Sequence, residues 1–197
     1  MTMVVLNAAQ VRAAMAVAAD EKDPRYYLRG MYLDADGGRM VSTNGSLIYL
    51  ANYVQTFLYP VIVPHVKVPA WATEVELSDF PDASRDPRLI LKFIGKSREE
   101  TVTVNRIEAK YPNYLNVSRN APKNTVEGGL AIQPGLITII GKAFGTKQVT
   151  MAVSKDQSMV YFTAASRTCE VIGMQYFKAD SPVMTANWLK PFGIGGA

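Results

Sequence analysis

One order of predicted elements occurs twice in this sequence, and the repetition restricts the folds open to the chain. Residues 2–55 read as a strand, a helix and three strands, and residues 126–179 read in the same order. The first helix lies within Val5–Asp20, where apolar residues recur at near-helical spacing and Asn7 is suited to cap the helix. The second helix begins at Pro134, which a first helical turn tolerates. The sequence therefore predicts an α+β fold built from β-α-β-β-β units.

Glycine and proline mark the turns between these elements. Asp36-Gly37-Gly38 and Asn44-Gly45 each separate two β-rich runs, and glycine permits the positive φ that tight hairpin turns require. The window Val66–Leu77 contains a proline and several β-branched residues, which disfavour a long helix. We expect only a short helix there, near Ala70–Val75.

Composition excludes several classes of protein. The chain has 197 residues, of which 48% are hydrophobic and 19% charged, so it can bury a core. No apolar run reaches the roughly 18 residues of a membrane helix, and Met1–Asn7 lacks the basic start and cleavage site of a signal peptide. A soluble, cytoplasmic protein is expected. With Cys169 and His65 as its single cysteine and histidine, the chain lacks a disulfide framework and the usual zinc ligands.

Acidic residues offer no catalytic arrangement either. They occur in turns and alternating strands without the spacing of a two-metal or glycosidase site, and solvent-exposed faces explain them: Asp34, Asp36, Glu74, Glu76, Glu99 and Glu100. We therefore expect no catalytic residue, no metal, no cofactor and no enzyme activity. The formal net charge of +4 is equally consistent with a phosphate-bearing partner and with an ordinary basic surface.

Three motifs, in a fixed order, carry a family resemblance. The first is the run Asp23-x-Arg25-Tyr26-Tyr27-Leu28-x-Gly30, followed by Val41-x-Thr43-Asn44-Gly45. The second and third are Val-Ile-Val-Pro at 61–64 and Tyr-Pro-Asn-Tyr at 111–114. Together they resemble the middle domain of the bacterial DNA polymerase III beta subunit, the sliding clamp, over about residues 4–118. Residues 171–177 occupy the place of the last strand of that family.

The resemblance implies a domain organisation. Each domain of a sliding clamp consists of two β-α-β-β-β halves, and the domains form a ring around duplex DNA. On that basis the chain contains about one and a half clamp domains: a clamp-like domain at 1–118 with halves 2–55 and 59–118, a linker at 119–128, a third half at 126–179, and a C-terminal arm at 180–197. A third half without its complement would expose a sheet edge and a helix flank, so we expect a homo-oligomer, most simply by two-fold pairing of third halves.

Candidate DNA contacts lie in the first motif. A clamp needs cations for phosphates and flat side chains for sugars and bases, and the loop that begins at Lys22 supplies both. The residues proposed for this role are Lys22, Arg25, Tyr26, Tyr27 and Arg29, with Arg12, Lys142 and Lys147 as basic residues in or next to the helices. The alternative is that Tyr26 and Tyr27 are ordinary strand residues, one of them in the core.

The resemblance also implies a hydrophobic pocket for short partner peptides. The matching positions are Leu28, Thr43, Gly45, Leu47 and Ile48, with Val171, Ile172, Met174 and Tyr176 as further candidates. Such a groove needs exposed aliphatic surface, and a charge placed at Leu47 would then abolish binding without unfolding the protein. The alternative is that these residues fill the core.

The function implied is that of a DNA sliding clamp-like polymerase processivity factor, in a shortened, phage-like relative of the family. Its partners would be double-stranded DNA and a DNA polymerase, with a clamp loader as a further candidate, bound through a short hydrophobic peptide. A second hypothesis is a clamp mimic or regulator, which binds replication proteins without encircling DNA.

Overall fold

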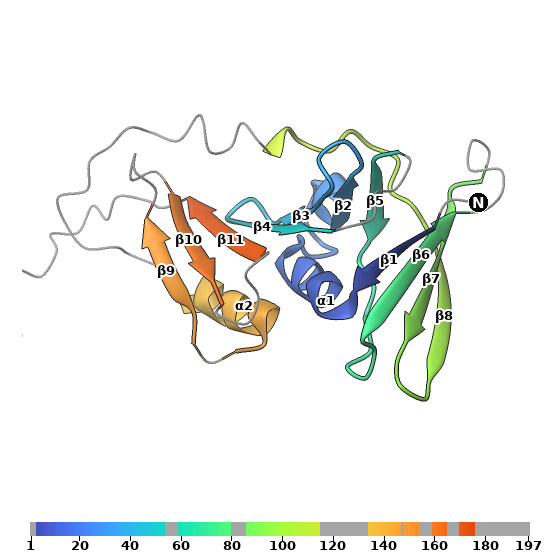
Figure 1. Ribbon diagram of the computed structural model, residues 1–197. Helices are drawn as coiled ribbons and strands as arrows, with labels where there is room; N and C mark the ends of the chain where they lie inside the picture. The colour runs from blue at the N-terminus through green and yellow to red at the C-terminus, as the bar shows by residue number, and fades with distance from the viewer. Residues whose placement is uncertain are drawn as a thin grey trace, which may run out of the picture.

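The computed structural model describes residues 3–53, 59–79, 86–114, 134–146, 148–153, 159–164 and 170–175. These residues form two antiparallel sheets and two α-helices (Figure 1). The elements follow in chain order as β1 Met3–Asn7, α1 Ala8–Val17, the 3-10 turn η1 Tyr26–Leu28, β2 Gly30–Asp34, β3 Arg39–Thr43, β4 Leu47–Asn52, β5 Val61–Pro64, β6 Glu74–Asp79, β7 Arg88–Ile94, β8 Glu99–Asn105, α2 Pro134–Phe144, β9 Thr150–Val153, β10 Met159–Thr163 and β11 Glu170–Gln175.

Helix α1 begins where the sequence predicts its cap. The Asn7 side chain accepts hydrogen bonds from the backbone N–H groups of Ala9 at 2.9 Å and Gln10 at 3.3 Å, which satisfies two donors of the first turn. Alanine-rich composition favours the helix, and an extended ψ of 154° at Ala18 ends it. The helix predicted within Val5–Asp20 is confirmed, as is the helix that begins at Pro134.

Both predicted turns are present. Gly38 has φ of 58° in the β2–β3 turn, and Gly45 has φ of 90° in the β3–β4 turn. A Cβ at Gly45 would also lie 2.5 Å from the Nη1 atom of Arg25, so the turn and the Arg25 side chain are packed together. The positive φ at Gly45 favours glycine there, and a side chain would also displace the Arg25 guanidinium.

The short helix expected near Ala70–Val75 is wrong. This stretch passes through a turn at 70–71, and strand β6 begins at Glu74. Two interactions hold it in that form: β6 pairs with β1, and the guanidinium of Arg12 donates to the carbonyl oxygens of Pro69 at 2.9 Å and Ala72 at 3.2 Å. The Pro69 carbonyl also accepts from the Ala72 N–H at 3.2 Å, as in a single turn, but the next N–H, that of Thr73, donates to the Ile94 carbonyl of β7 at 2.8 Å, so no helix continues.

The first two predicted halves exchange their opening strands. The four-stranded sheet has the order β1-β6-β7-β8, so β1 leaves its own half and pairs with strands of the next. Conversely, β5 pairs with β2, with Met31 opposite Val63. The segments on either side of residue 55 are therefore interlocked, and neither sheet is complete without both.

The third predicted half extends the second sheet, whose order is β5-β2-β3-β4-β11-β10-β9. Strand β11 pairs with β4, and α2 packs against α1 (Figure 1). At this junction the hydroxyl of Tyr49 donates to Glu170 Oε2 at 2.7 Å, and both side chains are buried. The predicted strand before α2, the linker at 119–128 and the arm at 180–197 lie outside the described residues, and the division into domains stays a prediction.

Apolar side chains form two clusters, one on each face of the seven-stranded sheet. The larger contains α1, the buried face of α2 and the inward residues of both sheets. Ser42, fully buried on β3, donates to the Ala14 carbonyl at 2.6 Å and fixes α1 to the sheet. The smaller cluster, on the opposite face, comprises Leu28, Val41, Ile48, Ile62, Tyr111 and Tyr114, together with Ala19. No helix among the described residues is long and apolar enough to span a membrane.

Candidate functional site

A cavity of about 220 Å³ lies beside the smaller cluster, where η1, the β3–β4 turn and the segment 111–114 meet Gly173 of β11. We call it the η1 cavity. It is lined by Arg25, Tyr27, Leu28, Thr43, Gly45, Ser46, Leu47, Ile48, Tyr111, Pro112, Tyr114 and Gly173. Five residues that the resemblance assigned to a peptide pocket, namely Leu28, Thr43, Gly45, Leu47 and Ile48, are thus brought together in one hollow.

The β3–β4 turn that forms one wall is fixed by its own side chains. Thr43 Oγ1 donates to the Leu47 carbonyl at 2.6 Å and accepts from the Gly45 N–H at 3.0 Å. Asn44 Oδ1 accepts from the N–H groups of Ser46 at 2.9 Å and Leu47 at 2.8 Å. Because Asn and Thr side chains replace backbone partners in this way, the wall keeps its shape without a ligand.

Leu28 and Ile48, which belong to the smaller cluster, form the aliphatic floor of the cavity, and both are buried. Leu47 is 1% exposed. The expectation that Leu47 is an exposed groove residue is therefore wrong, because its side chain belongs to the larger core cluster. A charge at Leu47 would test folding rather than binding.

The β11 candidates are divided by the pleat of the strand. Ile172 and Met174 point into the core and are buried, whereas Val171 is half-buried. Gly173 lies between them on the outer face, opposite Ile48 on one side and Tyr161 on the other. Because it has no side chain, it leaves room for the cavity, and sequence reasoning did not select it. Tyr176 lies outside the described residues.

Sequence reasoning also missed the aromatic wall. Tyr111 stacks on Tyr32 with ring centroids 4.6 Å apart and an interplanar angle of 6°. Pro112 and Tyr114 continue the wall, and the Tyr114 hydroxyl donates to Asp34. The Tyr-Pro-Asn-Tyr motif at 111–114, which is part of the resemblance, is the sequence signal for this wall.

The hydroxyl of Tyr111 is buried and has no hydrogen-bond partner in the described part of the chain. Burial raises the pKa of this phenol, because the charged form would lose its hydration.

An unpaired buried hydroxyl lowers stability. Tyr111→Phe is therefore expected to leave the free energy of unfolding unchanged or raise it by up to about 1 kcal/mol. Tyr114→Phe, which removes a made hydrogen bond, should lower it by about 1 kcal/mol. Denaturant unfolding of the two variants side by side distinguishes these outcomes, and a larger loss in Tyr111→Phe would contradict the first.

Two arginines of the predicted DNA-binding loop are engaged in internal contacts. Arg25 donates from Nε and Nη2 to the Asp23 carboxylate at 2.9 and 2.6 Å, and from Nη2 to the Asn44 carbonyl at 3.0 Å. These bonds lower the pKa of Asp23 to about 2 and raise that of Arg25. Arg29 Nε donates to the Asp23 carbonyl at 2.7 Å. Both residues shape the loop beside the η1 cavity.

The remaining candidates differ in accessibility. Tyr26 is 52% exposed and meets Tyr27 edge-on, with centroids 5.8 Å apart. Lys22 and Lys142 are exposed and border one open hollow between the end of α1 and α2. Arg12 donates to backbone carbonyls, as described above, and Lys147 lies outside the described residues.

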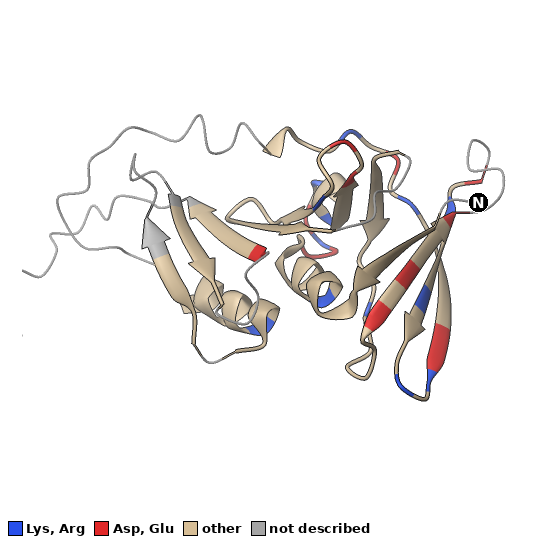
Figure 2. Cartoon of the chain, in the orientation of Figure 1, with Lys and Arg blue, Asp and Glu red and all other residues tan. Residues whose placement is uncertain are grey.

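Charge is unevenly distributed over the molecule. Helices α1 and α2 contain no Asp or Glu, and their charged residues are Arg12 and Lys142. The acidic residues of the strands concentrate on β6 and β8 of the four-stranded sheet, on the side of α1 away from α2 (Figure 2). Among the described residues no group of three or more His, Cys, Asp or Glu side chains could hold a metal ion.

Comparison with known proteins establishes the fold. No protein-family model and no curated protein sequence matches this chain. Solved structures do match. One is a putative DNA polymerase III beta subunit from Eubacterium rectale, with a TM-score of 0.62 and 9% sequence identity. The match covers 91% of this chain and 66% of the Eubacterium rectale chain. The beta subunit from Borrelia burgdorferi gives a TM-score of 0.61, 11% identity, and 91% and 65% coverage. This chain has the fold of the sliding clamps.

A third comparison agrees, with the sliding clamp from Bartonella birtlesii, at a TM-score of 0.59, 10% identity, and 90% and 66% coverage. The predicted α+β, clamp-like fold class is therefore confirmed. The chain spans about two thirds of the length of these sliding clamps. At such low identity the likeness concerns the fold, and the roles of individual residues rest on their own geometry.

Proposed function

We propose that this chain is a DNA sliding clamp-like processivity factor for a DNA polymerase. In this role it holds duplex DNA without reading its sequence and tethers a partner protein through the η1 cavity. One observation carries the proposal: five residues assigned to a peptide pocket by their motifs line a single hollow, in a chain with the fold of the sliding clamps. The proposal includes no catalytic step and no cofactor.

The chemistry of the cavity supports a peptide as its ligand. An aliphatic floor, tyrosine walls and a hydrogen-bonded turn at the rim suit one bulky apolar side chain held among backbone polar groups. The clamp from Bartonella birtlesii is bound to griselimycin, and the beta subunit from Borrelia burgdorferi is in complex with a natural product. For this chain we propose a short apolar segment of a DNA polymerase or clamp loader.

Duplex DNA is proposed to contact Lys22, Tyr26 and Lys142. The double variant Lys22→Ala/Lys142→Ala should weaken binding of every duplex sequence alike and reduce the slope of log K against log salt by up to about 2, since each phosphate contact contributes about 0.9. Fluorescence anisotropy at several salt concentrations measures this slope. The matched control is Lys96→Ala/Lys110→Ala, which removes two exposed lysines elsewhere. Equal slopes in the two double variants would place the DNA contact on another surface.

A second function, the clamp mimic or regulator, is favoured by a specific observation. The guanidinium groups of Arg12, Arg25 and Arg29 all donate to groups of their own chain. Three of the five described basic residues predicted to contact DNA are thus already bonded within the chain. Failure of the parent protein to bind duplex DNA at low salt, with peptide binding intact, would select this second function.

A further inference from the structure

A second hollow, of about 550 Å³, adjoins the η1 cavity, and the function proposed above does not use it. It is formed where Tyr59 and β5 meet Tyr32 of β2 and the segment 106–111. Figure 1 shows this segment passing over β5 and β2 after the end of β8. Tyr111 lines both hollows, so the two meet at this residue. We call the second one the β5 hollow.

The wall that the segment 106–111 forms is held in place by bonds within the chain. The Ile107 N–H donates to the Ile62 carbonyl of β5 at 3.0 Å. The Arg106 N–H donates to the Pro87 carbonyl at 2.8 Å. Because these bonds fix the segment where it leaves β8, the β5 hollow keeps its shape without a ligand, as most binding sites do.

Basic side chains outnumber acidic ones in the lining of the β5 hollow. They are Arg106 and the exposed Lys110, against Glu108. The Arg106 side chain is 20% exposed, and its Nη2 atom lies 3.3 Å from Glu108 Oε1, in a long ion pair whose acid is 69% exposed. Burial raises the pKa of Tyr59, whereas Arg106 acts in the opposite direction, which places the guanidinium next to this phenol. Because such an exposed ion pair contributes little, a carboxylate of a ligand can replace Glu108.

Three tyrosines line the β5 hollow, so it suits a peptide chain rather than a lone ion. They are Tyr32, Tyr59 and Tyr111, whose rings can pack against the backbone and aliphatic stems of a peptide. The Tyr59 hydroxyl donates to the buried Asp79 carboxylate at 3.0 Å, so this acid is paired inside the protein. The Tyr111 hydroxyl is buried without a partner in the described part of the chain, and a polar group of a bound chain can supply one.

We propose that the partner peptide of the η1 cavity continues into the β5 hollow with an acidic segment, whose carboxylates pair with Arg106 and Lys110. This inference rests on the proposed function, and it assigns the partner a charge pattern that the η1 cavity alone does not require. An extended chain advances about 3.3 Å per residue, so a few residues lead from one hollow into its neighbour. The β5 hollow then selects among apolar peptides, because a basic flank would be repelled.

Three labelled peptides test the proposal on the full chain by fluorescence anisotropy. The first is a short peptide with a hydrophobic pair and a glutamine, and the other two add three Glu residues at its N-terminal or its C-terminal end. We expect one of the two extended peptides to bind about tenfold more tightly at low salt. This gain should shrink as salt rises, because ion pairs near the surface are screened, and extension by three Gln residues should give no gain.

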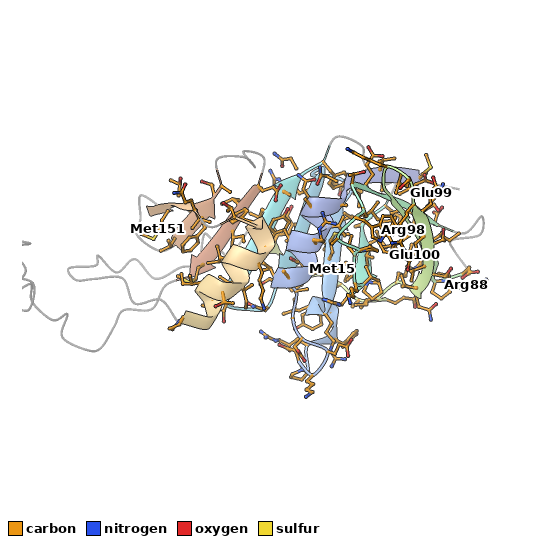
Figure 3. All side chains as sticks on the ribbon, turned by 90° about the horizontal axis from the view of Figure 1, so that it is seen from below. Met15, Arg88, Arg98, Glu99, Glu100 and Met151 are labelled. Carbon is orange, nitrogen blue, oxygen red and sulfur yellow. The ribbon has the colours of Figure 1, made fainter. Side chains whose placement is uncertain are left out.

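Arg106→Ala/Lys110→Ala should remove the gain and leave binding of the short peptide unchanged, because neither residue lines the η1 cavity. The matched control is Lys96→Ala/Arg98→Ala, which removes the same two kinds of side chain. Arg98 and Arg106 lie at opposite ends of β8, and Figure 3 shows Arg98 beside Glu99 at the start of that strand. The control variant should keep the gain.

Circular dichroism verifies that the variants fold. If Arg106→Ala/Lys110→Ala does not, Lys110→Glu at its exposed position takes its place and should abolish the gain by repulsion. Glu108→Gln should enlarge the gain, because it removes the carboxylate that competes for Arg106.

The outcomes separate this inference from the proposed function. If the short peptide binds and neither extension adds affinity, the inference is overturned and the proposed function stands. If no peptide binds, both are overturned. A gain that persists without Arg106 and Lys110, or that falls equally in the control variant, reflects general attraction to the net charge of +4 and overturns the inference. A single-stranded oligonucleotide that needs these two residues, with no gain from acidic extension, would assign the β5 hollow to nucleic acid and also overturn it.

Discussion

Replacing Gly173 with valine is expected to abolish binding of a short peptide that carries a hydrophobic pair and a glutamine. The new side chain would stand on the outer face of β11 between Ile48 and Tyr161 and fill the space that the glycine leaves at the η1 cavity. Valine suits a strand, so the sheet should be retained. The parent affinity should be micromolar, roughly −8 kcal/mol, and insensitive to salt.

Calorimetry or fluorescence anisotropy with a labelled peptide measures this loss, which we expect to exceed about a hundredfold, or about 2.8 kcal/mol. Thr103→Val, at an exposed position of β8, adds the same side chain far from the cavity and should bind as the parent does. Ser46→Glu, a change at the exposed rim, provides a second variant should Gly173→Val not fold. Undiminished peptide binding in both variants would remove the η1 cavity from the proposed function.

Gly30→Ala is expected to destabilise the protein by about 3 kcal/mol or more, because it overpacks backbone against backbone. A Cβ at residue 30 would lie 2.2 Å from the Val63 carbonyl oxygen and 3.1 Å from the Pro64 Cα. Backbone atoms cannot move aside as a flexible side chain can. Strand β5 would have to separate from β2, and with it the Ile62 carbonyl that accepts from Ile107.

Gly141→Ala is the matched control for that variant. Nothing lies within 4 Å of a Cβ at this position of α2, so the change should raise the free energy of unfolding by about 0.5–1 kcal/mol through helix propensity. Denaturant unfolding of the two variants should therefore give shifts of opposite sign. Equal midpoints would show that the β2–β5 pair relaxes at little cost. We also expect Gly30→Ala to weaken peptide binding, because the 107–114 segment supplies a wall of the cavity.

Features governed by near neighbours were predictable from the sequence. The Asn7 cap and the glycine turns at Gly38 and Gly45 depend on residues within a few positions, and all three are present. The order of strands and helices also follows from local periodicity. The short helix near Ala70–Val75 failed because distant strands bind its backbone: the Thr73 N–H donates to the Ile94 carbonyl, and β6 pairs with both β1 and β7.

Pairing between distant strands was not predictable in the same way. The sequence of β1 does not show that it pairs with β6 rather than with β2. Likewise, the sequence of β11 does not show that it pairs with β4. Because those pairings determine which face of each strand is inside, they also decide burial at the site. Leu47 and Gly173 illustrate this: next to β11 the Leu47 side chain is buried in the larger core cluster, and Gly173 leaves open space at the η1 cavity.

Motif spacing located the cavity, but it did not show that the arginines near it bond to their own chain. Asp23 and Arg25 are two residues apart, and the sequence permits either an exposed arginine or a closed pair. The loop geometry favours the ion pair between Asp23 and Arg25, because the Asn44 carbonyl accepts a hydrogen bond from the same guanidinium and holds it in place. Charge counts alone could not reveal that these arginines shape the loop.

The buried Tyr49–Glu170 contact restricts how the two parts of the long sheet can align. A slip of one residue between β4 and β11 is already penalised, because it would turn Ile172 and Met174 outward. A slip of two residues keeps every apolar side chain on its face, so hydrophobic alternation cannot oppose it. It would, however, separate the hydroxyl of Tyr49 from the buried carboxylate that accepts its hydrogen bond. One buried hydrogen bond between two apolar strands thus selects a single register, where hydrophobic alternation alone would allow several.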